Sequence, residues 1–422
     1  MGWARPSLSA EPPVTIGTGL SPLNGPWRFH VGDDPAWSSP SFDDHAWERV
    51  DLTPPPGAHD GDVGLPGYVP GWGKRGHEGY TGYAWYRLEV TVDNTSGQPL
   101  ALAGPTLVDS AYQLYLDGQP LGSSGDFSGA TPTVYGVRPS VFPLPAVTAH
   151  GTHTLHLALR VWMDPLDAAP ESGGVHVAPV IGTTETIDHL NQVQWWKTFT
   201  GYVVDAAEPL AFVVLTIMVF ALMACDTGCS YGWMATALIA LALLRVNQVL
   251  FYWTPWLSLH HYDFVVTVLL RPFVLLAWAL AWKGWLQQAW PRWLGPTAMA
   301  LTVVYFAAAL LGRPWLVDSD AVGSVSNGVV STTRIALSAI YIWVIVLAVA
   351  RAKHVSDYLA ALAAVLVGVG IFATELNLLG IPGIWFPYGV GVARGQYAYA
   401  AFIPLFFGLV LVRLGRSRRL RT

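Results

Sequence analysis

The second half of the chain carries seven apolar stretches separated by short connections. Each stretch is close to the ~20 residues that a helix needs to cross a hydrocarbon core about 30 Å thick. We therefore predict a bundle of seven transmembrane helices within residues 203–414. The stretches are Val203–Cys225, Tyr231–Trp253, Tyr262–Leu286, Pro296–Trp315, Val325–Arg351, Tyr358–Leu379 and Tyr397–Leu414.

The first half has a different pattern, in which short runs of β-forming residues alternate with Gly, Pro, Asn and Asp clusters. Such runs predict short strands, and Asp117-Gly118 is typical of a hairpin turn. We predict an all-β jelly-roll sandwich over residues 19–185. The expected strands are Trp27–Val31, Ala84–Val92, Ala111–Leu116, Thr152–Val161 and Val175–Val180, and Asp33, Asp34, Asp43 and Asp44 are expected in turns and caps.

These patterns divide the chain into five parts: an N-terminal segment (1–18), the sandwich (19–185), a linker and helix start (186–202), the seven-helix domain (203–414) and a basic tail (415–422). The composition agrees, with 52% hydrophobic and 12% charged residues and a mean hydropathy of +0.39. The net charge of −5 gives no reason to expect a nucleic acid partner.

The short connections determine the predicted orientation, because cytoplasmic loops are rich in Lys and Arg. A first helix that enters from outside places most basic residues inside and leaves only Arg313 and Arg394 in outer loops. The sandwich is then extracytoplasmic and the C-terminus is cytoplasmic. The inner basic residues are Lys283, Arg292, Arg351, Lys353, Arg413, Arg416, Arg418, Arg419 and Arg421.

Residues 1–14 contain no apolar region of a signal peptide, so we expect the natural N-terminus to differ from the one given. The sequence also stops at Thr422, directly after the basic tail. Cys225 and Cys229 are expected at the cytoplasmic end of the first helix, reduced, and without the spacing of a redox or zinc motif.

Catalytic motifs are missing from the sequence, which has no GxSxG elbow, Walker loop or HExxH helix. His260-His261 has no third ligand nearby in sequence and is expected to be a loop pair, not a metal site. We expect this chain to be no enzyme and to need no cofactor or metal.

One loop of the predicted sandwich combines aromatic and hydrogen-bonding residues, which suits a sugar or another polar ligand. It runs from Tyr68 to Trp85 and is rich in Gly. The alternative is that Trp72 and Tyr80 pack beneath the loop or onto the helices. The expected ligand-binding residues are Trp72, Lys74, Arg75, His77, Glu78, Tyr80 and Tyr83.

A second group of polar residues falls inside the predicted helices, toward their outer ends. Charges at membrane depth are costly unless they are paired or hydrated, so several on different helices predict a shared polar cavity. The group is Glu208, Arg245, Asn247, Gln248, Arg271, Arg334, Glu375 and Asn377. Three Arg against two Glu make this cavity mildly positive, and an anionic group could complete it. Salt bridges that only order the bundle are the alternative, and Glu375 with Arg245 or Arg271 is the first expected pair.

Two further features concern helix packing. Ala360, Ala364 and Gly368 form a small-residue stripe that lets a neighbouring helix approach, within one chain by default or in a homodimer as the minority interpretation. Pro404 removes a backbone donor from the last helix and is a candidate hinge.

Several motifs in the first half resemble the sugar-binding domain of glycoside hydrolase family 2, which implies a galactose-binding-like jelly roll. They run, in order, over Gly25–Phe29, Phe42–Trp47, Tyr83–Arg87 and Ala111–Gly118, followed by Gly122. Joined to seven helices by Gly173–Gly182, this domain resembles the bacterial seven-transmembrane receptors with diverse intracellular signalling modules. The acid and base residues of family 2 belong to a separate barrel domain, which is absent here.

The resemblance implies a bacterial inner-membrane receptor that senses an extracytoplasmic small-molecule or glycan ligand. Its output would be a histidine kinase, a diguanylate cyclase or a serine/threonine phosphatase, fused or separate, as the cytoplasmic partner. Two alternatives stay open from the residues: a membrane transporter and a membrane-anchored carbohydrate-binding protein.

Overall fold

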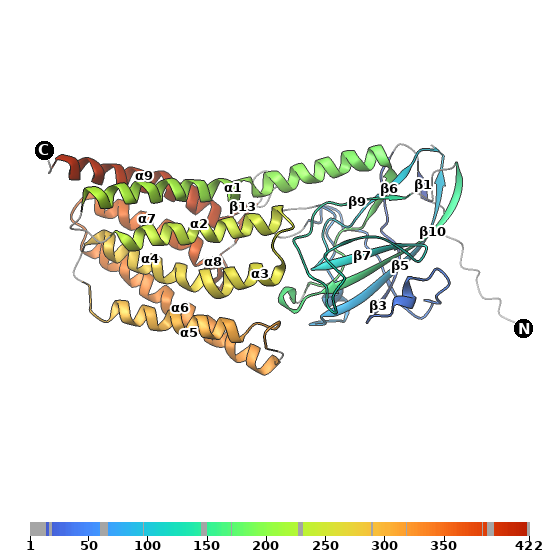
Figure 1. Cartoon of the computed structure of the whole chain (residues 1–422), viewed down its shortest axis with the longest axis horizontal. Helices are drawn as coiled ribbons and strands as arrows, with labels where there is room; N and C mark the ends of the chain where they lie inside the picture. The colour runs from blue at the N-terminus through green and yellow to red at the C-terminus, as the bar shows by residue number, and fades with distance from the viewer. Residues whose placement is uncertain are drawn as a thin grey trace, which may run out of the picture. The chain divides into compact units, whose positions relative to one another are not determined.

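The protein is described from a computed structural model, which places residues 14–16, 19–59, 66–95, 97–144, 150–169, 171–226, 231–287, 290–317, 319–381, 383–385 and 392–419. Its N-terminal part consists of β-sheets and its C-terminal part of helices (Figure 1). The chain divides into two compact units, residues 1–60 with 65–198 and residues 61–64 with 199–422. Cys229, residues 420–422 of the tail and most of the segment 1–18 lie outside the described residues.

Two sheets build the first unit. The larger has the order β4-β3-β5-β10-β7-β8, and β1 pairs in parallel with β5; the smaller has the order β2-β11-β6-β9. The larger sheet contains β1 (Val14–Ile16), β3 (Trp27–Val31), β4 (Glu48–Val50), β5 (Gly82–Asn94), β7 (Ala111–Leu116), β8 (Gln119–Ser124) and β10 (Gly151–Met163). The smaller contains β2 (Ser21–Pro22), β6 (Leu100–Ala103), β9 (Val141–Leu144) and β11 (Val180–Thr183), and short 3₁₀ turns are η1 (Pro35–Ser38), η2 (Trp72–Arg75) and η3 (Pro165–Asp167).

A hydrophobic core joins the facing sides of the two sheets. Successive residues of a strand point to opposite faces, so every second residue of β5 and β10 can enter this core. Tyr86 and Leu159 enter it from the larger sheet, and Leu102 and Ile181 enter it from the smaller one. The first unit is therefore a two-sheet sandwich.

The other face of the larger sheet is partly covered by the segment between β3 and β4. Trp85 is fully buried there in a small aromatic cluster with Trp47. The guanidinium of Arg87 donates to Asp44 Oδ2 at 2.8 Å, to the Ser39 carbonyl at 3.0 Å and to the Trp37 carbonyl. Because both faces of β5 are covered, its central residues do not alternate between buried and exposed.

Most of the expected strands are present, and the exceptions have physical reasons. Asp117 and Gly118, with φ of 48° and 80°, form the two-residue turn between β7 and β8. The expected strand Val175–Val180 is wrong, because β11 begins only at Val180 and Val175 makes a single bridge to Val108.

The four aspartates also divide between two roles. Asp34 and Asp43 accept backbone hydrogen bonds from residues two positions ahead, as turn residues do. Asp33 and Asp44 instead bind arginines of the larger sheet, Arg160 and Arg87. Asp44 also lies in a turn, because its carbonyl accepts from the Trp47 N–H at 3.0 Å, so the expectation is wrong only for Asp33 among these four.

Within its described residues, the helical part has six helices long and apolar enough to cross a membrane. These spans are Val203–Cys225, Gly232–Trp253, Leu259–Leu286, Leu294–Leu311, Ala321–Ala350 and Arg394–Ser417. The helices themselves are α1 (Thr184–Cys225), α2 (Gly232–Trp253), α3 (Leu259–Asp263), the π-helical η4 (Phe264–Leu270), α4 (Arg271–Leu286), α5 (Leu294–Leu311), α6 (Asp320–Ala350), α7 (Val355–Ile371), α8 (Ala373–Leu378) and α9 (Arg394–Arg419). A small hairpin of β12 (Ile384–Trp385) and β13 (Val392–Ala393) precedes α9.

The stretch expected as the sixth span is divided in two. α7 has 17 residues and ends at Ile371, and α8 follows after Phe372. Near this break the guanidinium of Arg394 donates to the carbonyl of Ala373, the first residue of α8, at 2.9 Å and to the carbonyl of Ile381, after α8, at 2.7 Å. Non-helical backbone is tolerated at membrane depth where neighbouring groups satisfy it, and Arg394 satisfies the Ile381 carbonyl in this way.

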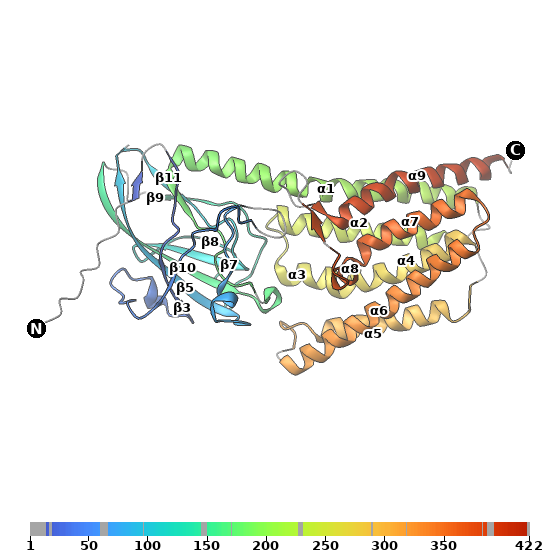
Figure 2. The same cartoon turned by 180° about the vertical axis from the view of Figure 1, so that it is seen from behind.

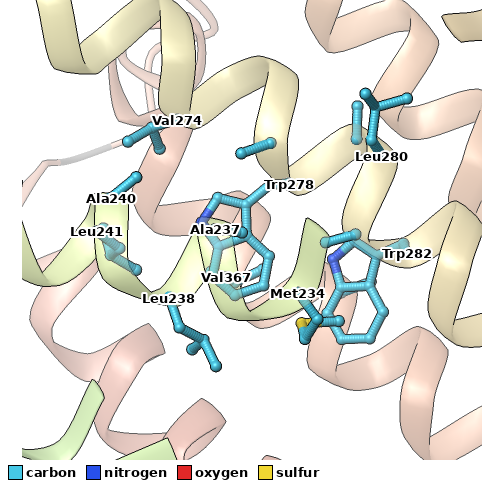
Figure 3. Close-up of a cluster of buried hydrophobic side chains, with 14 of the residues drawn as sticks. Met234, Ala237, Leu238, Ala240, Leu241, Val274, Trp278, Leu280, Trp282 and Val367 are labelled. Carbon is cyan, nitrogen blue, oxygen red and sulfur yellow. The ribbon is translucent and has the colours of Figure 1, made fainter. Parts of the chain in front are cut away.

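A continuous hydrophobic core holds the helices together. In Figure 3, Met234 and Leu238 of α2 lie with Trp278 and Trp282 of α4, and Val367 of α7 lies beside them. A buried hydrogen-bond chain adds α6: Trp282 Nε1 donates to Tyr341 Oη at 3.0 Å, and Tyr341 Oη donates to the Ala364 carbonyl at 2.7 Å.

Small residues allow the last helices to approach closely. Ala360 and Ala364 of the predicted stripe are buried inside the chain, and a Cβ on Gly368 would lie 2.8 Å from Tyr341. α7 lies beside α9 (Figure 2), where a Cβ on Gly370 would lie 2.2 Å from the ring of Tyr399. The stripe therefore serves packing within one chain.

Gly173→Ala should loosen the sandwich. The alanine Cβ would lie 2.2 Å from Trp72 Nε1, and the φ of +104° is unfavourable for alanine. We therefore expect the free energy of unfolding to fall by about 2 kcal/mol or more. Hydrogen exchange of the β5 amides should become faster. Gly19→Ala, which meets nothing within 4 Å, is the control; equal exchange in both variants would contradict this packing.

Candidate functional site

The aromatic residues of the expected sandwich loop are packed into the fold. Trp72 is 1% exposed, and its indole Nε1 donates to the Tyr80 carbonyl at 3.2 Å. The ring of Tyr80 packs against Trp72, and its hydroxyl donates to the Tyr83 carbonyl at 2.6 Å. Two interpretations of this loop were open, ligand binding and packing beneath the loop. Trp72 and Tyr80 follow the second, because both are packed into the fold.

The polar residues of the loop point to different partners. Lys74 pairs with Glu171 at 2.9 Å, and His77 Nε2 lies 2.9 Å from Glu48 Oε1. Arg75 is half-buried and Glu78 is exposed. The loop residues therefore spread over several small contacts instead of converging on one ligand.

Tyr83 lies on the outer face of the larger sheet, in a cluster that the sequence did not reveal. The guanidinium of Arg160 lies 4.2 Å from the Tyr83 ring centre and donates to Asp33 Oδ1 at 2.7 Å, while Trp162 packs against Tyr83. Burial lowers the pKa of Arg160, but the hydrogen bond and charge of Asp33 outweigh it and raise the pKa overall. Arg160 and Asp33 lie 127 positions apart, and only the sheet register places them together.

The helical part contains a cavity of about 320 Å³. Its walls come from α2, α4, α6, α7, α8, the β12–β13 hairpin and α9. Four arginines line it, and no Asp or Glu is among the described lining residues. The arginines are Arg245, Arg271, Arg334 and Arg394, and the apolar wall includes Leu241, Leu244, Val274, Leu275, Ile371 and Ile384.

Arg245 is compensated by two buried acids of α1. Its Nε lies 2.8 Å from Glu208 Oε2, and its Nη1 lies 3.6 Å from Asp205 Oδ1. Gln248 links the same groups, because it accepts from Arg245 Nη1 at 2.9 Å and donates to Asp205 Oδ2 at 3.4 Å. Asn247, also predicted for this site, donates instead to the Tyr262 carbonyl at 3.4 Å.

Arg334 of α6 forms a two-bond ion pair with Glu375 of α8. Nε donates to Oε1 at 2.6 Å and Nη2 donates to Oε2 at 2.8 Å. The expected pairing of Glu375 with Arg245 or Arg271 is therefore wrong. The break after α7 lets α8 present Glu375 to α6.

Arg394 at the start of α9 is buried and donates to several acceptors of the helical part. Besides the carbonyls of Ala373 and Ile381, it donates to Asn377 Oδ1 at 2.9 Å. The predicted residue Asn377 thus belongs to the cavity, but Arg394 was expected in an outer loop. Its position just before an apolar run was the signal that it could enter the bundle.

Arg271 follows directly after the π-helical segment η4. Its backbone N–H donates to the Val266 carbonyl, five residues back, and Pro272 next to it has no N–H to continue an α-helical ladder. This winding places Arg271 on the cavity wall, where it is half-buried. Among the described residues it has no carboxylate within ion-pair distance.

The sequence also missed three residues that complete the site. Asp205 and Gln396 are joined by a hydrogen bond of 3.0 Å between α1 and α9, and the ring of Tyr399 lies 5.1 Å from the Arg245 guanidinium. Each stands singly in an apolar or mixed stretch, where one polar residue gives no signal of its partners. Pro404, the expected hinge, lies inside a continuous α9, and its role as a hinge stays a prediction.

No family model and no curated protein matches this sequence. Several solved glycoside hydrolases are similar in structure to part of it. β-Glucuronidase 2 of Bacteroides uniformis, bound to cyclophellitol-6-carboxylate aziridine, is 19% identical with a TM-score of 0.28, over 39% of this chain and 17% of that chain. A family 2 glycosyl hydrolase of Bacteroides cellulosilyticus is 18% identical (TM-score 0.25, 39% and 20%), and a Ruminococcus gnavus β-glucuronidase is 12% identical (TM-score 0.27, 40% and 29%).

The matched region spans less than a third of each of these glycosidases. At these TM-scores the likeness says nothing about activity or ligand. What the described residues define is a β-sandwich joined to an apolar helical part that holds a cavity lined by arginines.

Glu375→Gln should destabilise the helical part strongly. It keeps the side-chain shape but leaves Arg334 without its carboxylate, and breaking a buried pair in this way costs about 3–5 kcal/mol. The midpoint of thermal unfolding in lipid nanodiscs should fall, whereas Glu78→Gln at an exposed site should leave it unchanged.

The double variant Arg334→Gln with Glu375→Gln should recover much of the loss, because it removes both charges. A single variant as stable as the unaltered protein would show that the pair does not support the fold.

Proposed function

We propose that this protein is a seven-helix membrane receptor whose ligand binds in the arginine-lined cavity. The cavity itself carries the proposal: arginines line part of its wall, it lies among apolar helices, and its walls come from several separate elements. A ligand that contacts several helices can bind one arrangement of them better than another, and it then shifts the population toward that arrangement.

The course of α9 supports a signalling role. Arg394 and Tyr399, near the start of this helix, line the cavity. Arg413, near its other end, donates to the Trp285 carbonyl at 2.8 Å and to the Tyr231 hydroxyl at 3.2 Å. One helix thus connects the cavity with contacts to the end of α4 and the residue before α2, so a shift of α9 at the cavity would change these contacts.

The motifs that resemble bacterial seven-transmembrane receptors with intracellular signalling modules support the same function. In this proposal α7 is the seventh span, because its 17 residues are at the lower limit for crossing a bilayer. The jelly-roll sandwich is extracytoplasmic, the C-terminus of α9 is cytoplasmic, and the membrane is the bacterial inner membrane. The output is a kinase, cyclase or phosphatase module, fused or separate.

A transporter is the second candidate, and the break between α7 and α8 is the observation that favours it. Transporter sites are often formed by interrupted helices whose freed carbonyls line the site. Here Arg394 donates to the carbonyls of Ala373, the first residue of α8, and of Ile381, after α8, so these two carbonyls already accept hydrogen bonds from the protein.

Spin labels at Val355 and Val412 would test the receptor proposal. Both residues are exposed, and they lie near the start of α7 and the end of α9, away from the cavity. Sugars, amino acids and organic acids would be screened in nanodiscs by thermal unfolding, after native cysteines are replaced by serine. We expect a compound that raises the unfolding midpoint to change the distance between the labels, without uptake into proteoliposomes.

The same screen separates the alternatives. Uptake of the compound into the vesicles would indicate a transporter. Binding with an unchanged distance would contradict the receptor proposal and leave a binding protein. A Gly408→Ala variant, whose Cβ would meet nothing within 4 Å, is the control for any change in α9 itself.

A further inference from the structure

The charges on the cavity wall are not balanced within the site. Four arginines line it among the described residues, and carboxylates of the described part lie against Arg245 (Glu208 and Asp205) and against Arg334 (Glu375). Arg271 has no carboxylate within ion-pair distance among the described residues. The acceptors at Arg394 named above, two carbonyls and an amide oxygen, are neutral.

An arginine keeps its positive charge in any protein environment, so the guanidinium cannot become neutral by losing a proton. Charge in an apolar surrounding is costly unless a counter-charge or water compensates it. Glu208 and Asp205 lie against Arg245, and Glu375 binds Arg334 through both oxygens. None of these carboxylates lies within ion-pair distance of Arg271, so water or an anion that enters the cavity supplies its compensation.

The size and the remaining wall of the cavity limit what can enter. A volume of about 320 Å³ is at the small end of ligand pockets, which range over roughly 300–1,000 Å³. Leu244, Val274 and Leu275 give one part of the wall an apolar character beside Arg271. This combination suits a molecule with one anionic group and a short apolar body.

We propose that the cavity binds a small organic anion, a carboxylate or a phosphate ester, through the guanidinium of Arg271, with Arg394 on the same wall. Arginine matches these groups because its planar fork offers two parallel N–H donors. The inference rests on the proposed ligand role of the cavity but not on signalling, so each can fail alone. The anionic group can come from a soluble molecule or from a lipid headgroup.

The test is equilibrium binding to the full chain in phosphatidylcholine nanodiscs, with butyrate, succinate and inorganic phosphate as probes. Butyramide and succinamide have the same shapes without the charge. We expect at least one anion to bind to the unaltered protein and its amide counterpart not to bind. Arg271→Gln should weaken that binding about tenfold or more, since it removes a charge-assisted hydrogen bond.

Two further variants keep the result interpretable. Arg271→Lys retains the charge but not the fork, so its affinity should lie between those of the unaltered protein and Arg271→Gln. Arg292→Gln removes the same charge from an exposed residue that does not line the cavity, and it should bind the anion normally.

A second set of nanodiscs that contains phosphatidylglycerol distinguishes the two sources. Arg271-dependent stabilisation by this lipid, with no binding of the soluble anions, would support an anion site filled by a headgroup. Equal affinity for an anion and its amide, unchanged affinity in Arg271→Gln, or no binding in either lipid would overturn the inference. Anion binding without any change in the Val355–Val412 distance would keep this site and refute the receptor.

Discussion

The helical part is organised by the need to compensate arginine side chains in an apolar environment. A guanidinium stays charged, so each one must find carboxylates, carbonyl oxygens or a ligand. Arg334 forms an ion pair with Glu375, and Arg245 forms ion pairs with two acids of α1. Arg394 donates hydrogen bonds to backbone carbonyls. These partners join α1 to α2, α6 to α8 and α8 to α9, so polar contacts connect these helices in addition to the apolar core.

The interruption between α7 and α8 lies beside these contacts. α7 ends at Ile371, α8 carries Glu375 to Arg334, and Arg394 donates to the carbonyl of Ala373, the first residue of α8. Gly370 and Gly395 let α7 and α9 approach closely beside this point, where a Cβ on Gly395 would lie 3.5 Å from Gly370. The irregular backbone and the polar site are thus one structural unit.

Arginines also stabilise the sandwich, where they bind the segment that covers the outer face of the larger sheet. Arg87 ties the β3–β4 segment to the larger sheet through backbone carbonyls and Asp44, and Arg160, whose guanidinium lies over the ring of Tyr83, binds Asp33. The loop Tyr68–Trp85, rich in ligand-type residues, uses Trp72 to close the hydrophobic core. Tryptophan suits a sugar-binding surface and a buried core equally well. Trp72 is buried because Gly173 and Gly174, which have no side chains, leave room for its ring.

Local pattern alone was enough for much of this protein. Period-two alternation, an Asp-Gly turn and runs of about 20 apolar residues depend on neighbouring positions, so β3, β7, the β7–β8 turn and the first two spans could be placed from the sequence. The charges within the predicted helices also predicted a shared polar cavity, because the cost of a charge at membrane depth is a property of each residue.

Which charges meet was decided by the tertiary structure. The pairing of Arg334 with Glu375, the entry of Arg394 and Asp205, and the lack of a carboxylate partner for Arg271 among the described residues depend on helix rotation, on the π-helical turn before Arg271 and on the break after α7. Those features arise from packing between segments far apart in the chain, and no local pattern contains them.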